Sequence, residues 1–396
     1  MRRGGTLIVA VVALGLLLSG PARAANPIQD ENALQGSAGW DAPSLTPGIL
    51  EGYANRISAA PGDTIDLKVS STESASYRVE VYRLGWYAGL GGRLMTCLPG
   101  CQSSEVAPAQ PYPTHDPATG SVRAQWATTD SFTVGPDWVS GYYVALLRKL
   151  SGDESGSGFV VPFIVRAPAA RPKSILVQAS VNTWQAYNKW GGKSLYNSNS
   201  TGGVHADKVS FDRPFHRDTQ GVYAYDLQLV RFLEREGYDA AYQTDVDTHQ
   251  NPLGLRAYRL VASAGHDEYW SKEMRDGFEG ARDVGVNLAF FGANTAYWQQ
   301  RYEDDGRTIV GYKDRAADPE PDQELKTIQF RVLIPARPEC KLLGVQYQGG
   351  SLSDGAAYLP YTTEDTNLGD PWFGATGFAP GATVPDIVGY EWDSIV

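Results

Sequence analysis

The chain has 396 residues, with 45 acidic against 34 basic side chains and a formal net charge of −11. A chain this acidic offers no basic stripe to collect phosphates, which argues against nucleic acid as a partner. Its length exceeds what one hydrophobic core usually serves, so we expect two domains.

The N-terminus is typical of a secretory signal peptide. Arg2 and Arg3 precede an uncharged apolar run from Thr6 to Leu18, and Ala22-Arg23-Ala24 supplies a small-x-small cleavage site. The alternative is a membrane anchor, but a spanning helix needs about 20 apolar residues, and this run is shorter. We therefore expect residues 1–24 to be removed on export, leaving an extracellular or periplasmic protein without a membrane span.

The first half of the chain is predicted to consist of short β-strands. Its β-branched and aromatic runs, several of which alternate apolar with polar residues, are separated by turn clusters of Pro, Gly, Asp and Ser. Strands at this spacing, with no convincing helix between them, predict an immunoglobulin-like β-sandwich over residues 25–167. The expected strands are Thr64–Ser71, Tyr77–Trp86, Val122–Val134, Tyr142–Arg148 and Phe159–Arg166.

A proline-bearing linker, residues 167–172, marks the predicted domain boundary. From residue 173 to 396, strands alternate with helices, which predicts an α/β domain with a mainly parallel sheet covered on both faces. Beyond about Gly306 the pattern weakens to strand-like pieces and a solvated loop at 318–322. The expected elements are strands at Ser174–Ala179, Tyr258–Ala264, Val286–Phe291 and Thr327–Ile334, a helix at Asp226–Glu236 ended by Gly237, and a helix capped by Ser271 that runs to about Asp283.

Three cysteines do not make a disulfide scaffold. Cys97 and Cys101 could close a small loop in an oxidising compartment, which would leave Cys340 as a single thiol; the pairing stays open from the sequence. None of the three sits in a recognisable nucleophile context, and no Gly-x-Ser-x-Gly elbow occurs. The sequence therefore disfavours cysteine-based and serine-based catalysis.

Polar and aromatic side chains follow three of the predicted strands, where ligands gather in a parallel sheet. The segments are Asn182–Tyr196, Gly265–Trp270 and Gly292–Asn294. His266 and Glu268 are two residues apart, so an extended backbone would point both side chains to the same side. These segments predict a functional site at the carboxyl edge of the sheet.

Four phrases in these segments carry a resemblance to a known family. They are Thr-Trp-Gln-Ala-Tyr-Asn (183–188), Gly-Gly-Lys-Ser-Leu-Tyr (191–196), Gly-His-Asp-Glu-Tyr-Trp-Ser (265–271) and Phe-Gly-Ala-Asn-Thr-Ala-Tyr-Trp (291–298). In this order they resemble the N,N-dimethylformamidase large-subunit family, from about residue 60 to the C-terminus. The resemblance implies a glutamine-amidotransferase-like α/β catalytic domain preceded by a β-sandwich.

In that family a single iron ion is held by two tyrosines and a glutamate. Carried over to the matching positions, Tyr187 and Tyr196 would be phenolate ligands of ferric iron and Glu268 the carboxylate ligand. Three anionic oxygen ligands suit a hard, highly charged ion, and such an ion can polarise an amide carbonyl. His266 would then shuttle a proton, and Asn294 would donate to the developing oxyanion.

Each candidate also has a purely structural interpretation. Either tyrosine could pack against the sheet edge, Glu268 could cap the helix that begins near Ser271, and His266 could hold a loop by hydrogen bonds to the backbone. The segment between the two tyrosines is shorter than in the namesake enzyme, so Tyr223 and Tyr225 are alternatives to Tyr196. Asp245-Val246-Asp247-Thr248-His249 resembles a metal cluster, but we favour a strand end and a turn cap there.

The sequence favours an exported, iron-dependent amidohydrolase that cleaves the C–N bond of a linear amide. Because the chain carries an export signal, a peptide-like or glycan-linked amide is as plausible a substrate as a small one. The alternative function is that of an exported, non-catalytic binding or cell-surface protein that retains the fold. An oligomer or a cell-surface partner is compatible with either hypothesis.

Overall fold

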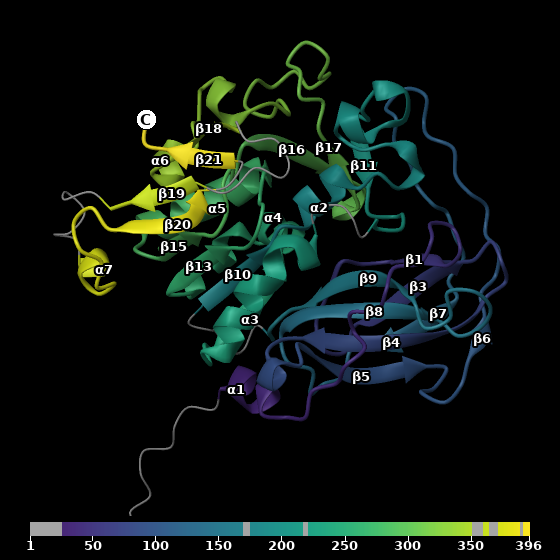
Figure 1. The fold of residues 1–396 in the computed structure, drawn as a ribbon. Coiled ribbons are helices and arrows are strands. Elements are labelled where there is room, and N and C mark those ends of the chain that lie inside the picture. The colour runs from purple at the N-terminus through teal and green to yellow at the C-terminus, as the bar shows by residue number, and fades with distance from the viewer. Residues whose placement is uncertain (1–25, 169–174, 217–220, 351–358, 364–370, 389–390) are drawn as a thin grey trace, which may run out of the picture.

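The computed structural model describes residues 26–168, 175–216, 221–350, 359–363, 371–388 and 391–396 in a mixed fold with several sheets (Figure 1). The predicted signal peptide and most of the predicted linker lie outside these residues. Within the described ranges, no helix combines the length and the apolar character needed to cross a membrane.

Two β-sheets in the N-terminal part pack against each other. The larger sheet has the order β2-β9-β8-β4-β5, with β6 paired to β4, and the smaller has the order β1-β3-β7. Alternating residues give each sheet one apolar face to bury, and Ile65, Val79 and Phe163 from both sheets join one core. The strands are β1 (Glu51–Ala54), β2 (Ser58–Ala59), β3 (Thr64–Ser70), β4 (Ser76–Leu84), β5 (Gly92–Leu98), β6 (Glu105–Val106), β7 (Asp130–Thr133), β8 (Gly141–Lys149) and β9 (Gly158–Val165).

The strand predicted at Val122–Val134 is wrong over most of its length, because β7 occupies only its C-terminal part. Upstream, the backbone bonds elsewhere: Ala124 N–H donates to Asp212 O at 2.7 Å, and the Tyr53 hydroxyl donates to Ala124 O. The side chain of Trp126 is buried in a cluster with Tyr53. The apolar pattern here reflects packing against an aromatic cluster and not strand pairing.

A four-stranded parallel sheet of order β12-β10-β13-β15 forms the centre of the C-terminal part. Val177 on one face of β10 shares a core with Val230 of α3, while Leu176 on the other face shares a core with Phe278 of α5. Both faces are thus covered, as the sequence predicted. The strands are β10 (Ile175–Ala179), β12 (Ala240–Thr244), β13 (Leu260–Ser263) and β15 (Asn287–Phe290), and the helices are α2 (Val181–Tyr187), α3 (Leu227–Arg235), α4 (Asp245–Gln250) and α5 (Lys272–Asp283).

Local signals begin α5 and end α3 where the sequence predicted. Ser271 caps α5, because its Oγ accepts a hydrogen bond from Met274 N–H at 3.2 Å. Gly237, just beyond α3, has φ of +73°, a left-handed conformation that glycine adopts without strain. The predictions of these two helices are confirmed, whereas β12 was missed.

The remaining elements were mostly missed by the sequence analysis. A second sheet of order β11-β17-β16-β14 and two two-stranded sheets, β18-β21 and β19-β20, belong to the C-terminal part. These elements are β11 (Lys208–Ser210), β14 (Tyr269–Ser271), β16 (Trp298–Glu303), β17 (Thr308–Val310), β18 (Gln346–Gly350), β19 (Leu359–Thr362), β20 (Thr383–Val388), β21 (Glu391–Ser394), α6 (Cys340–Leu343) and α7 (Pro371–Gly374). Short helical turns are η1 (Tyr87–Gly89), η2 (Trp190–Gly192), η3 (Asn197–Asn199), η4 (Thr201–Gly203), η5 (Val222–Asp226), η6 (Pro252–Ala257), η7 (Asp304–Gly306) and η8 (Phe330–Val332).

Two predictions near the C-terminal end are wrong. The segment Thr327–Ile334 makes one isolated bridge and a helical turn instead of a strand, because Phe330 packs into the α5 core. The loop at 318–322 is not fully solvated, since Asp318 is 2% exposed. Its carboxylate accepts hydrogen bonds from Arg301 at 2.9 Å and from Thr327 at 2.7 Å, which compensates its burial.

The two parts of the chain share one hydrophobic core. Tyr142 of β8 and Val230 of α3 belong to the same buried cluster. The N-terminal helix α1 (Pro27–Asn32) lies against α3, where the side chains of Asn26 and Gln29 donate to Gly237 O at 2.8 and 2.9 Å. Because the core is continuous, we expect the two parts to unfold together.

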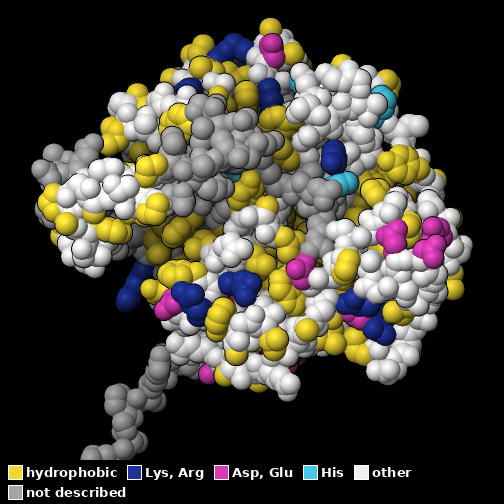
Figure 2. Space-filling model, viewed as in Figure 1, with side chains coloured by type: hydrophobic (Ala, Val, Ile, Leu, Met, Phe, Trp, Pro, Cys, Tyr) yellow, Lys and Arg dark blue, Asp and Glu magenta, His cyan; other side chains and the backbone are white. Residues whose placement is uncertain are grey.

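The surface carries charges of both signs. Figure 2 shows Lys and Arg side chains in separate small groups among acidic and apolar ones. Surface ion pairs such as Lys272–Asp276, with Nζ 2.7 Å from Oδ2, neutralise part of this charge. On the face shown, positive charge is not gathered into a continuous stripe.

Candidate functional site

Three chain segments meet at the carboxyl edge of the parallel sheet. They follow β10, β13 and β15, the order in which the sequence placed them. The loops after β13 and β15 approach so closely that a Cβ on Gly292 would lie 2.2 Å from Gly265 O. Gly265 itself has φ of +62°. Glycine at both positions therefore permits His266 and Asn294 to lie in adjoining loops.

Two tyrosines from the first segment lie side by side. Tyr187 is the last residue of α2, and the chain turns back so that Leu195 N–H donates to Ala186 O at 2.9 Å. The ring of Tyr196 consequently stacks on that of Tyr187, with centroids 4.2 Å apart and planes inclined by 26°. Both phenols thus point into the same site from one return of the chain.

Glu268 receives hydrogen bonds from both phenols. Tyr187 Oη donates to Glu268 Oε2 at 3.0 Å, and Tyr196 Oη lies 2.7 Å from the same oxygen. Tyr269 Oη in turn donates to Tyr196 Oη at 2.6 Å. We call Tyr187, Tyr196 and Glu268 the tyrosine–carboxylate cluster.

The backbone of Glu268 is held on both sides. Its N–H donates to Thr183 Oγ1 of α2 at 2.9 Å, and its carbonyl accepts from the N–H groups of Tyr297 and Trp298 at 3.0 Å. The side chain is 4% exposed. Glu268 is therefore oriented by α2 and by the chain that leads into β16, and it does not cap α5, where Ser271 supplies the cap.

Burial controls the charge of the two phenols. Burial, and then the negative charge of Glu268, raises the pKa of Tyr187 far above its ordinary value of 10. The same two causes, in the same order, raise the pKa of Tyr196. Both tyrosines are therefore neutral hydrogen-bond donors to one carboxylate at neutral pH, unless a cation takes the place of their protons.

His266 joins the cluster from the same loop as Glu268. Its Nε2 lies 3.7 Å from Glu268 Oε2 and 3.5 Å from Glu391 Oε2. The side chain is 7% exposed, and burial lowers the pKa of His266 against the opposing charges of Glu268 and Asp393. The imidazole thus lies between two carboxylates.

Asn294 lies in the neighbouring loop, and its backbone N–H is the group that bonds to a residue of the site. Its N–H donates to Asp393 Oδ1 at 2.9 Å, and its φ of +58° is left-handed. Asn294 is 4% exposed, and its side-chain Oδ1 has no hydrogen-bond partner among the described residues. The four other predicted site residues are brought together directly, whereas Asn294 adjoins them.

Four further residues at the site were missed by the sequence analysis. Lys313 lies with Nζ 3.4 Å from the ring centroid of Tyr196, and burial lowers its pKa to about 7 against the charge of Glu268. Burial, with Glu268 and Asp393, raises the pKa of Glu391 to about 7. The other two missed residues are Tyr269 and Asp393. Tyr269 belongs to the phrase at 265–271 that carries the family resemblance. Glu391 and Asp393 have the i, i+2 spacing of one strand face, and this spacing could have pointed to them.

The alternative tyrosines occupy other places. Tyr225 is 36% exposed, and its ring lies 6.2 Å from that of His266. Tyr223 stacks on Trp40 at 6.0 Å. Among the described residues, the phenols that donate to Glu268 come from Tyr187 and Tyr196.

The acidic run at 245–249 lies within helix α4, directly after the end of β12, and does not form the strand end and turn cap that we favoured. Thr244 Oγ1 accepts from Asp247 N–H at 3.2 Å while the Asp247 carboxylate accepts from Thr244 N–H at 2.8 Å, a capping box. His249 Nδ1 lies 2.9 Å from Ser271 Oγ. In the described part of the chain, no three His, Cys, Asp or Glu side chains are grouped so as to hold a metal ion.

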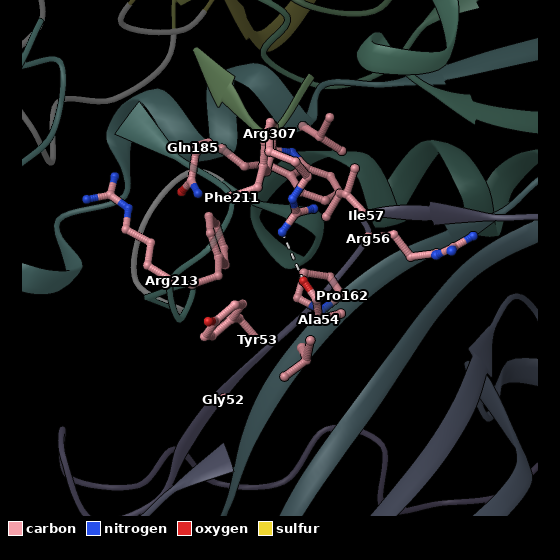
Figure 3. A pocket seen from close by; sticks show the side chains of 14 residues that line it. Gly52, Tyr53, Ala54, Arg56, Ile57, Pro162, Gln185, Phe211, Arg213 and Arg307 are labelled. Carbon is pink, nitrogen blue, oxygen red and sulfur yellow. Dashed lines mark hydrogen bonds between the residues drawn. The ribbon is translucent and has the colours of Figure 1, made fainter. Parts of the chain in front are cut away.

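A separate cavity lies where the N-terminal and C-terminal parts meet (Figure 3). It is lined by aromatic and aliphatic side chains together with Arg56, Arg213 and Arg307, and it shares no lining residue with the tyrosine–carboxylate cluster. Arg307 donates to Ala54 O at 3.0 Å across it and is paired with Asp212 at 2.6 Å. This cavity is therefore distinct from the site at the sheet edge.

The fold and the cluster define a mixed α/β protein with a buried tyrosine–carboxylate site. Residues 78–396 match the family described as N,N-dimethylformamidase beta subunit-like, C-terminal, and the chain belongs to this family. No curated protein matches the chain. Solved structures that match include the sulfur carrier protein SoxY from Chlorobium limicola f thiosulfatophilum, at 9% identity and a TM-score of 0.16, over 32% of this chain and 84% of that chain. A likeness this weak does not bear on fold or function.

Proposed function

We propose that this protein is an exported, metal-dependent hydrolase that cleaves the C–N bond of an amide at a ferric ion held by Tyr187, Tyr196 and Glu268. The observation that carries the proposal is the convergence of two phenolic oxygens on one buried carboxylate, within 3.0 Å. Membership of the dimethylformamidase-like family supports amide hydrolysis as the reaction class.

The donor set suits a hard, highly charged cation. Tyr187, Tyr196 and Glu268 would present three anionic oxygens once the phenols lose their protons, a set that favours ferric iron over soft ions. Burial opposes phenolate formation without a cation, and a bound cation reverses that preference. When bound, such an ion supplies Lewis-acid polarisation of an amide carbonyl.

Two residues of the chain would assist the reaction. His266 Nε2 lies near two carboxylates, Glu268 and Glu391, so the imidazole is placed to take up and release a proton. The Asn294 side chain is buried, and its Nδ2 group is the part of the side chain that can donate a hydrogen bond to a ligand. We assign it the stabilisation of negative charge on the amide oxygen.

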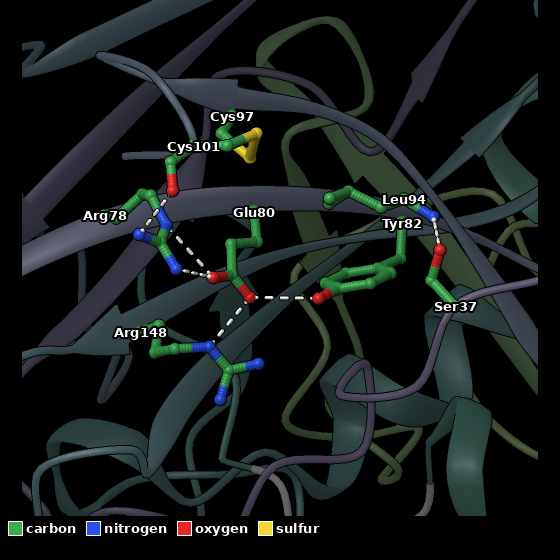
Figure 4. Close-up of a disulfide and its surroundings, with 8 residues drawn as sticks. All are labelled: Ser37, Arg78, Glu80, Tyr82, Leu94, Cys97, Cys101 and Arg148. Atoms are coloured by element: carbon green, nitrogen blue, oxygen red, sulfur yellow. Dashed lines mark hydrogen bonds and ion pairs between the residues drawn. A yellow bond between two sulfur atoms is a disulfide. The ribbon is translucent and has the colours of Figure 1, made fainter. Parts of the chain in front are cut away.

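The proposal includes the organisation of the chain. We assign residues 1–24 to a cleaved signal peptide, 25–167 to an immunoglobulin-like sandwich and 173–396 to a glutamine-amidotransferase-like domain. Two packed sheets and a covered parallel sheet support the two domain assignments. The disulfide between Cys97 and Cys101 (Figure 4) supports export, because disulfides persist in oxidising compartments.

The proposed substrate is a linear amide, either small or peptide-like. The partly exposed Tyr225 adjoins the buried His266, which suits a substrate whose amide end reaches inward from the surface. Nucleic acid is excluded from the proposal, because the chain is acidic overall.

Metal analysis of the purified protein, with a visible absorption spectrum, tests the proposal. We expect about one iron per chain and a phenolate-to-iron charge-transfer band. The variants Tyr187→Phe and Tyr196→Phe should each weaken the band, and Glu268→Ala should fold yet lose the metal. Tyr242→Phe is a matched control, because the Tyr242 hydroxyl also bonds a buried glutamate, Glu234, at 3.1 Å.

The outcome separates the two hypotheses. A wild-type protein with neither iron nor a band, even after iron is supplied, would favour an exported binding or cell-surface protein. Unchanged metal content in Glu268→Ala would show that the ligand assignment is wrong. With iron bound, screening of linear amides then identifies the substrate.

A further inference from the structure

Arg213 is a buried arginine that bonds to the return of the chain between the two cluster tyrosines. The residue is 1% exposed. Its Nη1 donates to Trp190 O at 3.0 Å and to Lys193 O at 2.7 Å, and its Nη2 donates to Asn188 O at 2.9 Å. One guanidinium thus satisfies three carbonyls of the segment that joins Tyr187 to Tyr196.

The segment that joins Tyr187 to Tyr196 needs a buried hydrogen-bond donor because its carbonyls turn inward. Gly191 and Gly192 have φ of +76° and +78°, which reverses the chain over two residues. A Cβ on Gly191 would lie 2.5 Å from a side-chain atom of Val122, so the turn is also packed against the N-terminal part. Buried carbonyls without donors would each cost free energy, and Arg213 supplies donors to three of them.

A second set of hydrogen bonds ties the same two segments together. Asn188, the residue after Tyr187, accepts on Oδ1 from His216 N–H at 3.1 Å and donates from Nδ2 to Pro214 O at 2.9 Å. Asn188 is fully buried. Hydrogen bonds therefore join segment 188–193, which directly follows Tyr187, to segment 213–216.

In the described part of the chain, no carboxylate balances the charge of Arg213. No described Asp or Glu forms an ion pair with it, and burial lowers its pKa to about 9. Burying a cation without an acidic partner costs free energy, and the hydrogen bonds from Arg213 to the three carbonyls compensate that cost. Figure 3 shows the Arg213 guanidinium directed away from Arg307, so it does not point at the groups that line the centre of the cavity.

We propose that Arg213 is the positioning residue that sets the separation of the Tyr187 and Tyr196 phenols. Its planar fork holds the return in the one shape that stacks the two rings at 4.2 Å. The consequence for metal binding rests on the proposed function, whereas the claim that Arg213 holds the return does not. Lysine at this position would keep the charge but would present its donors from a single nitrogen, which cannot span the three carbonyls.

The test compares Arg213→Lys and Arg213→Met with Arg275→Lys. Arg275 is also fully buried, but it lies on α5 and bonds Glu279 at 2.7 Å and Pro338 O at 3.0 Å, so it controls for the cost of replacing a buried arginine. Hydrogen exchange is measured on metal-free protein, and ferric affinity is measured from the charge-transfer band.

We expect exchange of the amides in residues 188–196 to quicken about 10-fold or more in both Arg213 variants. The β8 amides and the same segment in Arg275→Lys should be unchanged. Ferric affinity should fall about 10- to 100-fold, the usual effect of losing a group that orients metal ligands. A shift in the wavelength of the band would report altered phenolate geometry, which general destabilisation does not cause.

Two results would overturn the inference. The first is wild-type exchange in residues 188–196 for Arg213→Lys, which keeps charge and most of the volume and so serves where Arg213→Met does not fold. The second is an equal loss of ferric affinity in Arg213→Lys and Arg275→Lys. A wild-type protein that binds no iron would reject the proposed function alone, because the exchange measurement needs no metal.

Discussion

Arg83 Nη2 lies 2.7 Å from Glu234 Oε1, and neither side chain is exposed to solvent. Arg83 Nη1 also donates to Glu234 Oε2 at 2.9 Å, so the pair is bidentate. Because Arg83 belongs to β4 and Glu234 to α3, the contact joins the sheets of the N-terminal part to the part that carries the candidate site. A buried pair of this kind tolerates loss of neither partner.

We therefore expect Glu234→Gln to lower the free energy of unfolding by about 3–5 kcal/mol, because the guanidinium of Arg83 stays buried without a carboxylate. Urea unfolding at neutral pH measures the change. The control is Glu236→Gln, two residues further along the chain. The Glu236 side chain is 45% exposed, so its replacement should cost under about 0.5 kcal/mol. Equal effects of the two substitutions would contradict the role given to the pair.

Reduction of the disulfide should have a modest effect. Cys97 and Cys101 close a loop with a sequence separation of 4, beside the Arg78 guanidinium, which donates to Cys101 O at 2.8 Å (Figure 4). A loop this short corresponds to about 2 kcal/mol of unfolding free energy. Unfolding with and without reductant measures it, and Cys340→Ser should leave the difference unchanged. A reductant effect near zero in both proteins would show that the bond does not stabilise the fold.

Stability should fall as the pH rises through the range in which Glu105 titrates. Burial, together with the neighbouring Asp130 carboxylate, raises the pKa of Glu105 from 4.5 to about 7. An acid with a raised pKa binds its proton more tightly in the folded state, so its contribution is full below about pH 4.5 and is lost as the pH rises past 7.

Glu105→Gln should flatten this part of the stability profile between about pH 4.5 and 7. Unfolding free energies across that range give the slope. Glu73→Gln, whose side chain is 51% exposed, serves as the control and should keep the wild-type slope. A Glu105→Gln profile that parallels the wild type would mean that another group produces the dependence.

His266→Gln should separate metal binding from turnover. Iron content should match the wild type, because the proposed ligands are untouched, while amide hydrolysis should fall about 10²- to 10⁴-fold. Metal analysis and the hydrolysis rate are measured on the same samples, with Glu268→Ala as the variant expected to lose both. An unaltered rate in His266→Gln would remove the imidazole from the mechanism.

Much of the local structure followed from patterns within a few residues. The helix predicted at Asp226–Glu236 is observed at Leu227–Arg235, and the cap at Ser271 is in place. Apolar spacing and caps act over one or two turns, so they can be read without knowledge of the fold. Strand pairing is less local, which is why Val122–Val134 failed: its apolar residues pack on aromatic rings and not on a neighbouring strand.

The candidate site also has features that follow from local sequence and features that depend on tertiary packing. The sequence placed His266 and Glu268 in one loop after a buried strand, since both lie within a few residues of that strand's end. The meeting of Tyr196 with Glu268, 72 residues away, was expected from the family resemblance and not from any local pattern. Only the tertiary structure placed Lys313 over the Tyr196 ring. Nothing near Lys313 in the chain distinguishes it from a surface lysine, because its burial depends on how distant segments pack. Short-range periodicity decided the elements, and long-range packing decided which side chains meet.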